Sequence, residues 1–476
     1  MTMFGIKESE AATLVHTVSS EPLDREATRD RVARAMWSGI IEPGDRTAGL
    51  IVTHLGAALA LTLVIEGRSP SAVIDALAQT GAGDLGEDAG LVADLAKALA
   101  RWKPRVVPEA TLTALRRAER VGARLLAPQS PDWPGGLDDL GFHAPLALWC
   151  RGADGALGAL ANSIALVGAR AATGYGEHVT MEASAGLVDR GYAIVSGAAY
   201  GIDGMAHRAA LASHGVTVAF LAGGVDRFYP SGHDTLLTRI AESGAVISEL
   251  PCGEPPTKWR FLQRNRLIAA ASRATVVMEA GWRSGSLNTA GHAAALARPL
   301  GAVPGPVTSA ASAGCHRLIR EFDAVCVTNP DEMAELAPLT FDELKPGRFD
   351  LDGSSSPANS AEAEAEAEAA ARSGSGTAAE AAAAAGSGTE AEAAAGSGTN
   401  RVDPRPSRPV SLGDRPPVQL RVLDALSARS PRTVVDVAAR CGLSVATVQA
   451  TLGLLQLEQK VIERETGWAV VPRGRE

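Results

Sequence analysis

The chain has 476 residues, with 45 Lys and Arg against 54 Asp and Glu, which gives a formal net charge of −9. Its 46% hydrophobic and 21% charged residues exclude a wholly disordered chain, and its length predicts two or three domains. Residues 351–400 hold seven Glu and one Asp against one Arg, so −7 of the charge belongs there and −2 to the rest. A nearly neutral folded part leaves nucleic-acid binding open, because local basic patches decide it.

The chain has five widely spaced cysteines and no Cys-x-x-Cys pair: Cys150, Cys252, Cys315, Cys326 and Cys441. This pattern argues against a disulfide framework or a metal site and predicts a reducing, cytoplasmic location. The first twenty residues contain no apolar run, so no signal peptide is expected. Residues 48–65 are apolar and about long enough to cross a bilayer, but His54 and the small residues favour a buried pair of helices.

Two patterns of hydrophobic residues succeed each other along the chain. Residues 27–102 predict a small helical domain with helices over 27–38, 48–65, 71–80 and 91–102. From residue 163, apolar runs predict buried strands over 163–167, 193–195, 217–221, 245–248, 275–279 and 300–303. Between them, helices are expected near 176–190, 203–214, 234–243, 264–272 and 286–298. This alternation predicts an α/β fold with a parallel, doubly wound sheet.

Residues 353–417 have low sequence complexity, because the unit Gly-Ser-Gly-Thr recurs between Ala/Glu blocks. Such a segment buries too little apolar surface to fold and is expected to be a disordered spacer. Beyond it, 419–429, 433–441 and 444–457 predict three helices and 461–470 a two-stranded wing, which is a winged-helix pattern. The expected organisation is a helical domain (1–104), an α/β core (105–345), a disordered linker (346–417) and a winged-helix domain (418–476).

The first predicted strands of the sheet end in loops rich in small residues. Gly168-Ala169-Arg170 follows the first strand, Ser196-Gly197 the second and Gly223-Gly224 the third. Ligands of parallel sheets lie at the carboxyl ends of the strands, and glycines let the backbone approach them. Arg170 could clamp a phosphate with its planar guanidinium, or it could be a solvated side chain on an ordinary turn. The chain has no Gly-x-Gly-x-x-Gly and no Gly-Lys-[Ser/Thr] motif, so neither a dinucleotide site nor a P-loop is predicted.

The densest functional signal is residues 255–278, which contain Lys258, four arginines and no acidic residue. Trp259 and Phe261 lie among the basic residues. Basic side chains bind phosphates and aromatic rings stack on unpaired bases, so this mixture is typical of single-stranded nucleic-acid binding. The alternative is a solvated basic helix start with two core aromatic residues. Ser284-Gly285-Ser286 opens a later helix and offers an anion-binding start.

A series of motifs over about residues 120–335 resembles the DNA processing protein A family of bacteria, also called DprA or Smf. The motifs are Leu166-Val-Gly-Ala-Arg170, Ser196-Gly…Gly201-Ile-Asp203…Ala206-His207, Tyr229-Pro230, Ser248-Glu249, Phe261-x-x-Arg264-Asn-Arg266, Ser284-Gly-Ser286 and Ala302-Val-Pro-Gly305. The helical N-terminal part and the winged-helix pattern also resemble parts of family members. The chain departs from the family pattern at Leu262, where Pro is usual, at Tyr200, where a small or basic residue is frequent, and at His316, where Asn is usual.

This resemblance implies a Rossmann-like core that binds single-stranded DNA, forms a homodimer and loads RecA recombinase onto the strand during natural transformation or DNA processing. It implies no catalytic residue, no cofactor, no metal and no membrane partner. Carried over by motif, the residues expected at the DNA-binding site are Arg170, Lys258, Phe261, Arg264, Asn265, Arg266, Ser196, Gly197, Gly223, Gly224, Ser284, Gly285 and Ser286.

Two other functions compete with this interpretation. Sheets with glycine-rich loops also resemble nucleotide-processing enzymes that act at a ribose 5-phosphate and need a Gly-Gly-x-Gly-Thr loop with a catalytic carboxylate. Glu279 comes near the place of that carboxylate, but residues 281–286 lack the loop. A scaffold whose winged helix binds duplex DNA is the other option, although the predicted recognition helix 444–457 contains no Lys or Arg. The sequence therefore favours a single-strand-binding protein that is not an enzyme.

Overall fold

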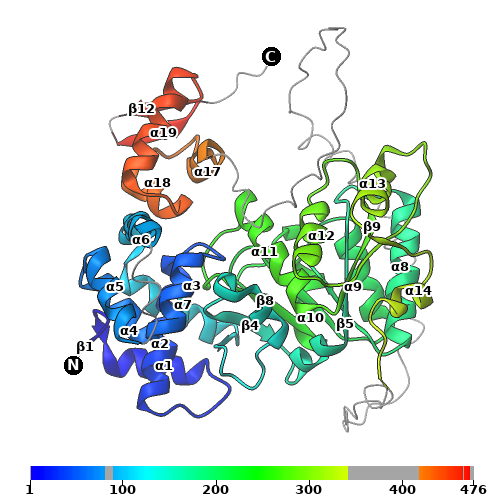
Figure 1. The fold of residues 1–476 in the computed structure, drawn as a ribbon, viewed down its shortest axis with the longest axis horizontal. Helices are drawn as coiled ribbons and strands as arrows, with labels where there is room; N and C mark the ends of the chain where they lie inside the picture. Colours follow the sequence, from blue (N-terminus) through cyan, green and yellow to red (C-terminus); the bar gives the residue numbers. More distant parts are fainter. Residues whose placement is uncertain (1, 81–88, 341–417, 465, 472–476) are drawn as a thin grey trace. The chain divides into compact units, whose positions relative to one another are not determined.

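The computed structural model describes residues 2–80, 89–340, 418–464 and 466–471, drawn in colour in Figure 1. The predicted linker, 346–417, lies outside these ranges. Within them, no single helix has the length and hydropathy needed to span a membrane. Two pairs of consecutive helices meet the length and hydropathy criteria only if each pair is counted as one segment, and both pairs are sharply bent. They are Arg46–Leu55 with Ala57–Ile65 and Val434–Cys441 with Val445–Leu457.

The N-terminal region is helical and begins with a short hairpin. Asp24, Asp45 and Ser69 cap three of its helices by accepting hydrogen bonds from first-turn N–H groups. The apolar stretch 48–65, where a pair of helices is expected, forms two helices bent by 116° at Gly56, whose φ of +76° favours glycine. The elements are β1 (Thr2–Met3), β2 (Ile6–Lys7), α1 (Glu8–Thr17), α2 (Arg25–Ile40), α3 (Arg46–Leu55), α4 (Ala57–Ile65), α5 (Pro70–Gln79), α6 (Ala89–Trp102) and α7 (Pro108–Arg120).

The core of the fold is a nine-stranded sheet in the order β11-β10-β9-β5-β6-β7-β8-β4-β3. The seven strands from β11 to β8 run parallel, and β4 and β3 extend the sheet with antiparallel pairing. This extension lies in the stretch 105–160, where the sequence pattern predicts no strand. The strands are β3 (Arg124–Leu126), β4 (Leu148–Gly152), β5 (Ser163–Gly168), β6 (Ala193–Ser196), β7 (Thr217–Phe220), β8 (Ala245–Ser248), β9 (Ala274–Glu279), β10 (Leu300–Ala302) and β11 (Val325–Cys326).

Helices cover both faces of the sheet, which confirms the doubly wound α/β fold (Figure 1). Along β5, Ile164 and Leu166 pack with α8, α9 and α14, whereas Ala165 and Val167 pack on the other face with α11, α12 and α13. Both faces of the central strands are therefore buried, as in other parallel sheets. The helices are α8 (Gly174–Asp189), α9 (Ile202–Ala212), α10 (Asp234–Ser243), α11 (Lys258–Ala271), α12 (Ser286–Ala295), α13 (Ala313–Glu321) and α14 (Pro330–Glu335).

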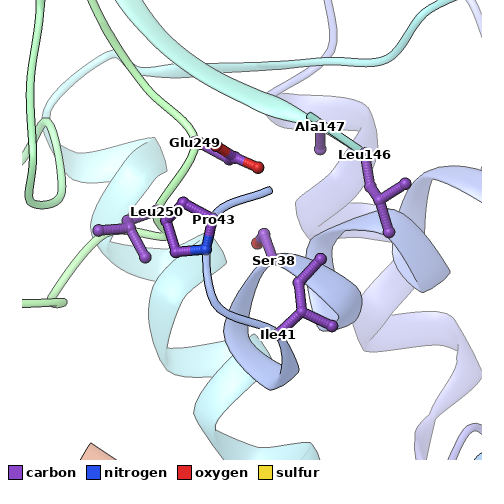
Figure 2. Close-up of a pocket in the computed structure, with 7 residues that line it drawn as sticks. All are labelled: Ser38, Ile41, Pro43, Leu146, Ala147, Glu249 and Leu250. Carbon is purple, nitrogen blue, oxygen red and sulfur yellow. The ribbon is translucent and has the colours of Figure 1, made fainter. Parts of the chain in front are cut away.

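The helical region packs directly against the antiparallel end of the sheet. The guanidinium of Arg34 donates to the carbonyl of Leu146 at 2.8 Å, and the indole N–H of Trp149 donates to Ser38 Oγ at 3.2 Å. A small pocket with no room for a water molecule lies at this contact, between α2 and the carboxyl end of β8 (Figure 2). Its lining includes Glu249 and Leu250 but none of the residues predicted to bind DNA.

Residues 418–470 form three short helices followed by a hairpin, which is the predicted winged helix. Its elements are α17 (Val418–Ala425), α18 (Val434–Cys441), α19 (Val445–Leu457), β12 (Val461–Arg464) and β13 (Gly467–Val470). Thr433 and Ser444 cap α18 and α19 through their side-chain oxygens. Val422, Val437, Val448 and Leu452 are fully buried in a small core of their own.

Candidate nucleic-acid interface

Four loops meet at one edge of the parallel sheet, because β9, β5, β6 and β7 are neighbours and run in the same direction. Arg170 follows β5, Gly197 follows β6, Gly223 follows β7 and Ser284 follows β9. The sequence motifs that lie far apart along the chain are thereby brought to the same edge. This edge is the expected ligand side of an open α/β sheet.

A half-buried aromatic ring with two arginines near it is the main feature of this edge. The guanidinium carbon of Arg170 lies 4.9 Å from the Phe261 ring centroid, and that of Arg264 lies 5.8 Å away. The ring of Tyr229 is also close, with centroids 5.7 Å apart and an interplanar angle of 54°. Arg170 is exposed, so its charge is accessible to a ligand at the ring.

Arg264 lies under this ring and is buried. One of its terminal nitrogens donates to the carbonyl of Gly197 at 2.7 Å and to the carbonyl of Phe220. Burial lowers its pKa to about 10, and the nearby carboxyl of Asp203 opposes that effect, so the group is charged at neutral pH. A Cβ at Gly197 would lie within 2.4 Å of this guanidinium, which explains the glycine.

Asp203 is the buried counter-charge of Arg264. Its carboxylate accepts hydrogen bonds from the backbone N–H groups of Gly197 at 3.1 Å and of Ala199 at 3.4 Å. Burial raises the pKa of Asp203, while Arg264 acts in the opposite direction. The loop after β6 is thus held by the buried Asp203 carboxyl through its hydrogen bonds with the loop backbone.

Asn265 connects this cluster to the loop before α12. Its Oδ1 accepts from Nε of Arg264 at 3.3 Å, and its Nδ2 donates to the carbonyl of Gly285 at 3.4 Å and to Asn288 Oδ1 at 3.3 Å. The hydroxyls of Ser284 and Ser286 lie 2.8 Å apart at the start of α12. Asn265 therefore holds the exposed Gly285 turn in place.

Two arginines of the basic segment form internal ion pairs. Arg266 is buried and contacts both carboxylate oxygens of Glu249, at 2.7 and 2.9 Å. Arg260 is buried as well and pairs with Glu42 at 2.9 Å and Glu254 at 2.7 Å. All three glutamates precede residues 255–278 in the sequence, and Glu254 does so by only one position. The composition of that segment alone therefore overstates how many of its arginines are free to bind a ligand.

Lys258 and the remaining predicted residues differ widely in accessibility. Lys258 is exposed at the first turn of α11, where Thr257 caps the helix by accepting from the Arg260 N–H at 3.3 Å. Ser196 is buried and donates its hydroxyl to the carbonyl of Leu166 at 2.7 Å. Gly223 and Gly224 are buried, and a Cβ at either would approach the backbone of residues 251–256 to about 3 Å or less. These three residues shape the loops, whereas Lys258 faces solvent.

Glu279 has a defined structural partner. Its two carboxylate oxygens accept hydrogen bonds from the backbone N–H of Thr173 at 2.9 Å and from the Thr173 hydroxyl at 2.6 Å. Glu279 is buried, and a Cβ at Gly176 would lie 2.5 Å from its carboxylate. The arrangement ties the end of β9 to the start of α8 and gives no support to the enzymatic alternative.

No group of three or more His, Cys, Asp or Glu able to hold a metal occurs in the described ranges.

The three departures from the family pattern are accommodated locally. Leu262 continues α11 without a break. Tyr200 is exposed, with its ring edge-on to His233 at a centroid distance of 4.8 Å. His316 Nε2 lies 2.9 Å from the carbonyl of Gly305. Sequence reasoning did not select Tyr229 as a site residue, although Tyr229-Pro230 was among the family motifs.

Comparison with known proteins agrees with the fold and its motifs. A family model described as DNA recombination-mediator protein A matches residues 124–338, and one described as the DprA winged helix domain matches residues 405–467. A putative DNA processing protein DprA of Mycobacterium tuberculosis is 50% identical over 242 residues, which are 48% of this chain and 62% of that protein. DNA processing protein DprA of Streptococcus pneumoniae is 40% identical over 172 residues, 36% of this chain and 61% of that protein. The matches to these two relatives thus span about three fifths of their length.

Solved structures of two such proteins are also similar to this chain. The X-ray structure of DprA from Streptococcus pneumoniae has a TM-score of 0.49 and 28% identity, and the match covers 65% of this chain and 96% of that chain. A structure of DNA processing protein A from Helicobacter pylori, described for its single-stranded DNA binding mode, has a TM-score of 0.40 and 28% identity over 45% of this chain and 94% of that chain. From the two family models and the named relatives, we conclude that the chain belongs to the DprA/Smf family of DNA processing proteins.

Proposed function

We propose that this protein binds single-stranded DNA at the carboxyl edge of its parallel sheet, without sequence preference and without catalytic turnover. The single observation that carries the proposal is the Phe261 ring, half-buried, with the exposed guanidinium of Arg170 at 4.9 Å. Phe261 can stack on an unpaired base while Arg170 binds the adjoining phosphate. A duplex conceals its base faces, so this pairing of ring and cation favours a single strand.

The predicted site residues divide by accessibility into two roles. Arg170, Lys258, Phe261 and the Ser284-Gly285-Ser286 turn contact the strand directly in this proposal. Arg264 and Asn265 are buried and hold the ring and the turn in position, whereas buried Arg266 ties α11 to Glu249 after β8. Ser196, Gly197, Gly223 and Gly224 keep the loops small, so that the backbone lies close to the phosphates.

We further propose that the protein acts as a homodimer in the cytoplasm and loads RecA recombinase onto the bound strand in natural transformation or DNA processing. The family model's description as a recombination mediator supports the recombination role in this proposal. A mediator must hold the strand in a form that another protein can take over, and backbone and stacking contacts without base-edge recognition suit that task.

The proposal is tested by competition between labelled dT20 and unlabelled single strand or duplex of the same length. We expect the single strand to displace the probe far better than the duplex. The recombinase step is tested by the rate of RecA ATP hydrolysis on DNA covered with single-strand-binding protein, which should rise when this protein is added. Equal competition by duplex contradicts the binding proposal, and an unchanged RecA rate contradicts the loading step alone.

A further inference from the structure

The strongly exposed aromatic side chains of the described chain gather at one edge of the sheet. They are Tyr175 at 41%, Tyr200 at 45%, Tyr229 at 49% and Trp282 at 57% exposure. They follow β5, β6, β7 and β9 respectively, and these four strands are neighbours. Exposed aromatic rings along one track are the usual stacking surfaces for unpaired bases.

Trp282 is the most exposed of the four, and a fixed cation supports its ring. The guanidinium carbon of Arg317 lies 4.9 Å from the Trp282 ring centroid and 5.2 Å from that of Phe322. Glu321 pairs with the same guanidinium at 2.9 Å. Two rings and a carboxylate together restrict Arg317, so the indole rests on an ordered support while more than half of Trp282 stays exposed.

The loop that carries Trp282 is held by the helix that carries Arg317. The N–H of Gly314 donates to the carbonyl of Ala280 at 2.7 Å, at the start of α13. A Cβ at Gly314 would lie 2.7 Å from the carbonyl of Gly281, so only a glycine lets α13 approach this closely. The backbone just before Trp282 is therefore held against the start of α13.

The side chains around the indole favour a nucleic acid over a protein partner. The next residue, Arg283, is exposed and is followed by the Ser284-Gly285-Ser286 turn at the start of α12. Two acidic groups on the adjoining elements are engaged, since Glu321 pairs with Arg317 and Glu279 is buried against Thr173. A ring bordered by a free arginine and a helix start offers base stacking and phosphate binding together.

We infer that Trp282 forms a second base-stacking subsite, separate from the Phe261 ring, on the same single strand; this inference rests on the proposed function. The register pairs Gly168 with Glu279, so Arg170 and Trp282 follow adjacent strand ends. Their Cα atoms are at most about 22 Å apart by chain reach and strand spacing. A stacked strand rising 3.4 Å per nucleotide covers that distance in at most about six or seven nucleotides.

The test compares dT4, which fits one subsite, with dT12, which spans both, using the full-length protein. Trp282→Ala should weaken dT12 binding by roughly 5- to 150-fold and change dT4 binding by less than about 2-fold. Trp282→Phe should restore most of the loss, because it keeps a ring. Leu59→Ala, which removes an exposed apolar side chain from α4, is the matched control and should leave both affinities unchanged.

If a variant does not fold, the unaltered protein is tested instead. It is photo-cross-linked to dT12 that carries one 5-iodouracil. Cross-links to Trp282 and Phe261 should peak at two different positions, no more than about seven nucleotides apart. If Phe261→Ala weakens dT12 binding and Trp282→Ala does not, the second subsite is wrong and the proposed function stands. If neither variant changes binding, the proposed function fails as well. A Trp282→Ala protein that loses self-association but keeps its dT12 affinity overturns the subsite in favour of a protein contact.

Discussion

The guanidinium carbon of Arg170 lies 4.9 Å from the centroid of the Phe261 ring. Arg170 stands two residues beyond β5, and Phe261 lies in the first turns of α11, so the contact joins two distant parts of the chain at one sheet edge. The pair combines a phosphate-binding group with a stacking surface. Stacking and charge contribute separately to binding at such a site and respond differently to salt.

Replacing Phe261 by Ala should weaken single-strand binding by about 1–3 kcal/mol per base stacked, with the salt dependence nearly unchanged. Stacking releases no counterions, so the slope of log K against log salt concentration should stay the same. Binding isotherms at several salt concentrations and thermal unfolding of the same variant check this. A loss of about 3–5 kcal/mol in stability with normal binding of the folded protein would instead make Phe261 a core residue.

Replacing Arg170 or Lys258 by Ala should lower the salt slope by about 0.7 each, because each exposed cation is expected to neutralise one phosphate. Arg190→Ala is the charge-matched control: its guanidinium pairs with Asp331 at 2.6 Å, at the end of α8 and away from this edge. The control should leave the slope unchanged. A slope that falls equally in all three variants contradicts a localised site.

Glu42 makes stability depend on pH in the acid range. Burial alone would raise its pKa, but the guanidiniums of Arg260 and Arg105 outweigh burial and lower it to about 2. A folded-state pKa below the unfolded value stabilises the protein above about pH 4.5, and this stabilisation is lost as pH falls toward 2. Glu42→Gln should therefore unfold about 3 kcal/mol more easily at pH 7, with the difference from the unaltered protein vanishing near pH 2.

The control for that prediction is Glu66→Gln, which removes an exposed ion pair with Arg68 at 2.9 Å. It should change the free energy of unfolding by less than about 1 kcal/mol, because exposed pairs are screened by water. Denaturant unfolding at pH 7, 4.5 and 3 distinguishes the two variants. A pH-independent difference between Glu42→Gln and the unaltered protein would show that the charge of Glu42 is not the cause.

The winged helix should contribute little to DNA affinity. Its helix α19 carries no Lys or Arg and presents only Gln449 and Gln456 as exposed polar groups able to reach base edges. Leu454 and Leu457 on the same helix are exposed, which suits a contact with protein better than with phosphate. The double variant Gln449→Ala, Gln456→Ala should bind single strand and duplex as the unaltered protein does. A marked loss of duplex binding would make α19 a DNA-reading helix.

The sequence pattern was sufficient to predict the six strands β5 to β10 and the helices between them. Buried parallel strands such as β5 are apolar on both faces, so they appear as continuous runs flanked by glycine. The antiparallel strands β3 and β4 were missed because they are short and lie in a Pro- and Trp-rich stretch whose pairing partner, β8, is distant in sequence. The pair of helices expected over 48–65 is present, but hydropathy alone did not place its break at Gly56.

The sequence predicted which residues lie at the site better than it predicted which of them are exposed to solvent. Arg266 and Arg260 look like free cations in a segment with no acidic residue, yet Glu249 and Glu42 reach them through the tertiary fold. Tyr229 could be identified beside Phe261 only after β7 and α11 were placed. Composition reports which charges a segment has, but their counter-charges depend on the packing of other elements.

The most direct test of the central claim is the salt dependence of dT20 binding compared with that of a duplex of the same length. With three to five phosphate contacts, log K for the single strand should fall with log salt at a slope of roughly −2 to −3.5, and the duplex should bind much more weakly at every salt concentration. A salt-insensitive affinity, or duplex binding as tight as single-strand binding, would contradict the account.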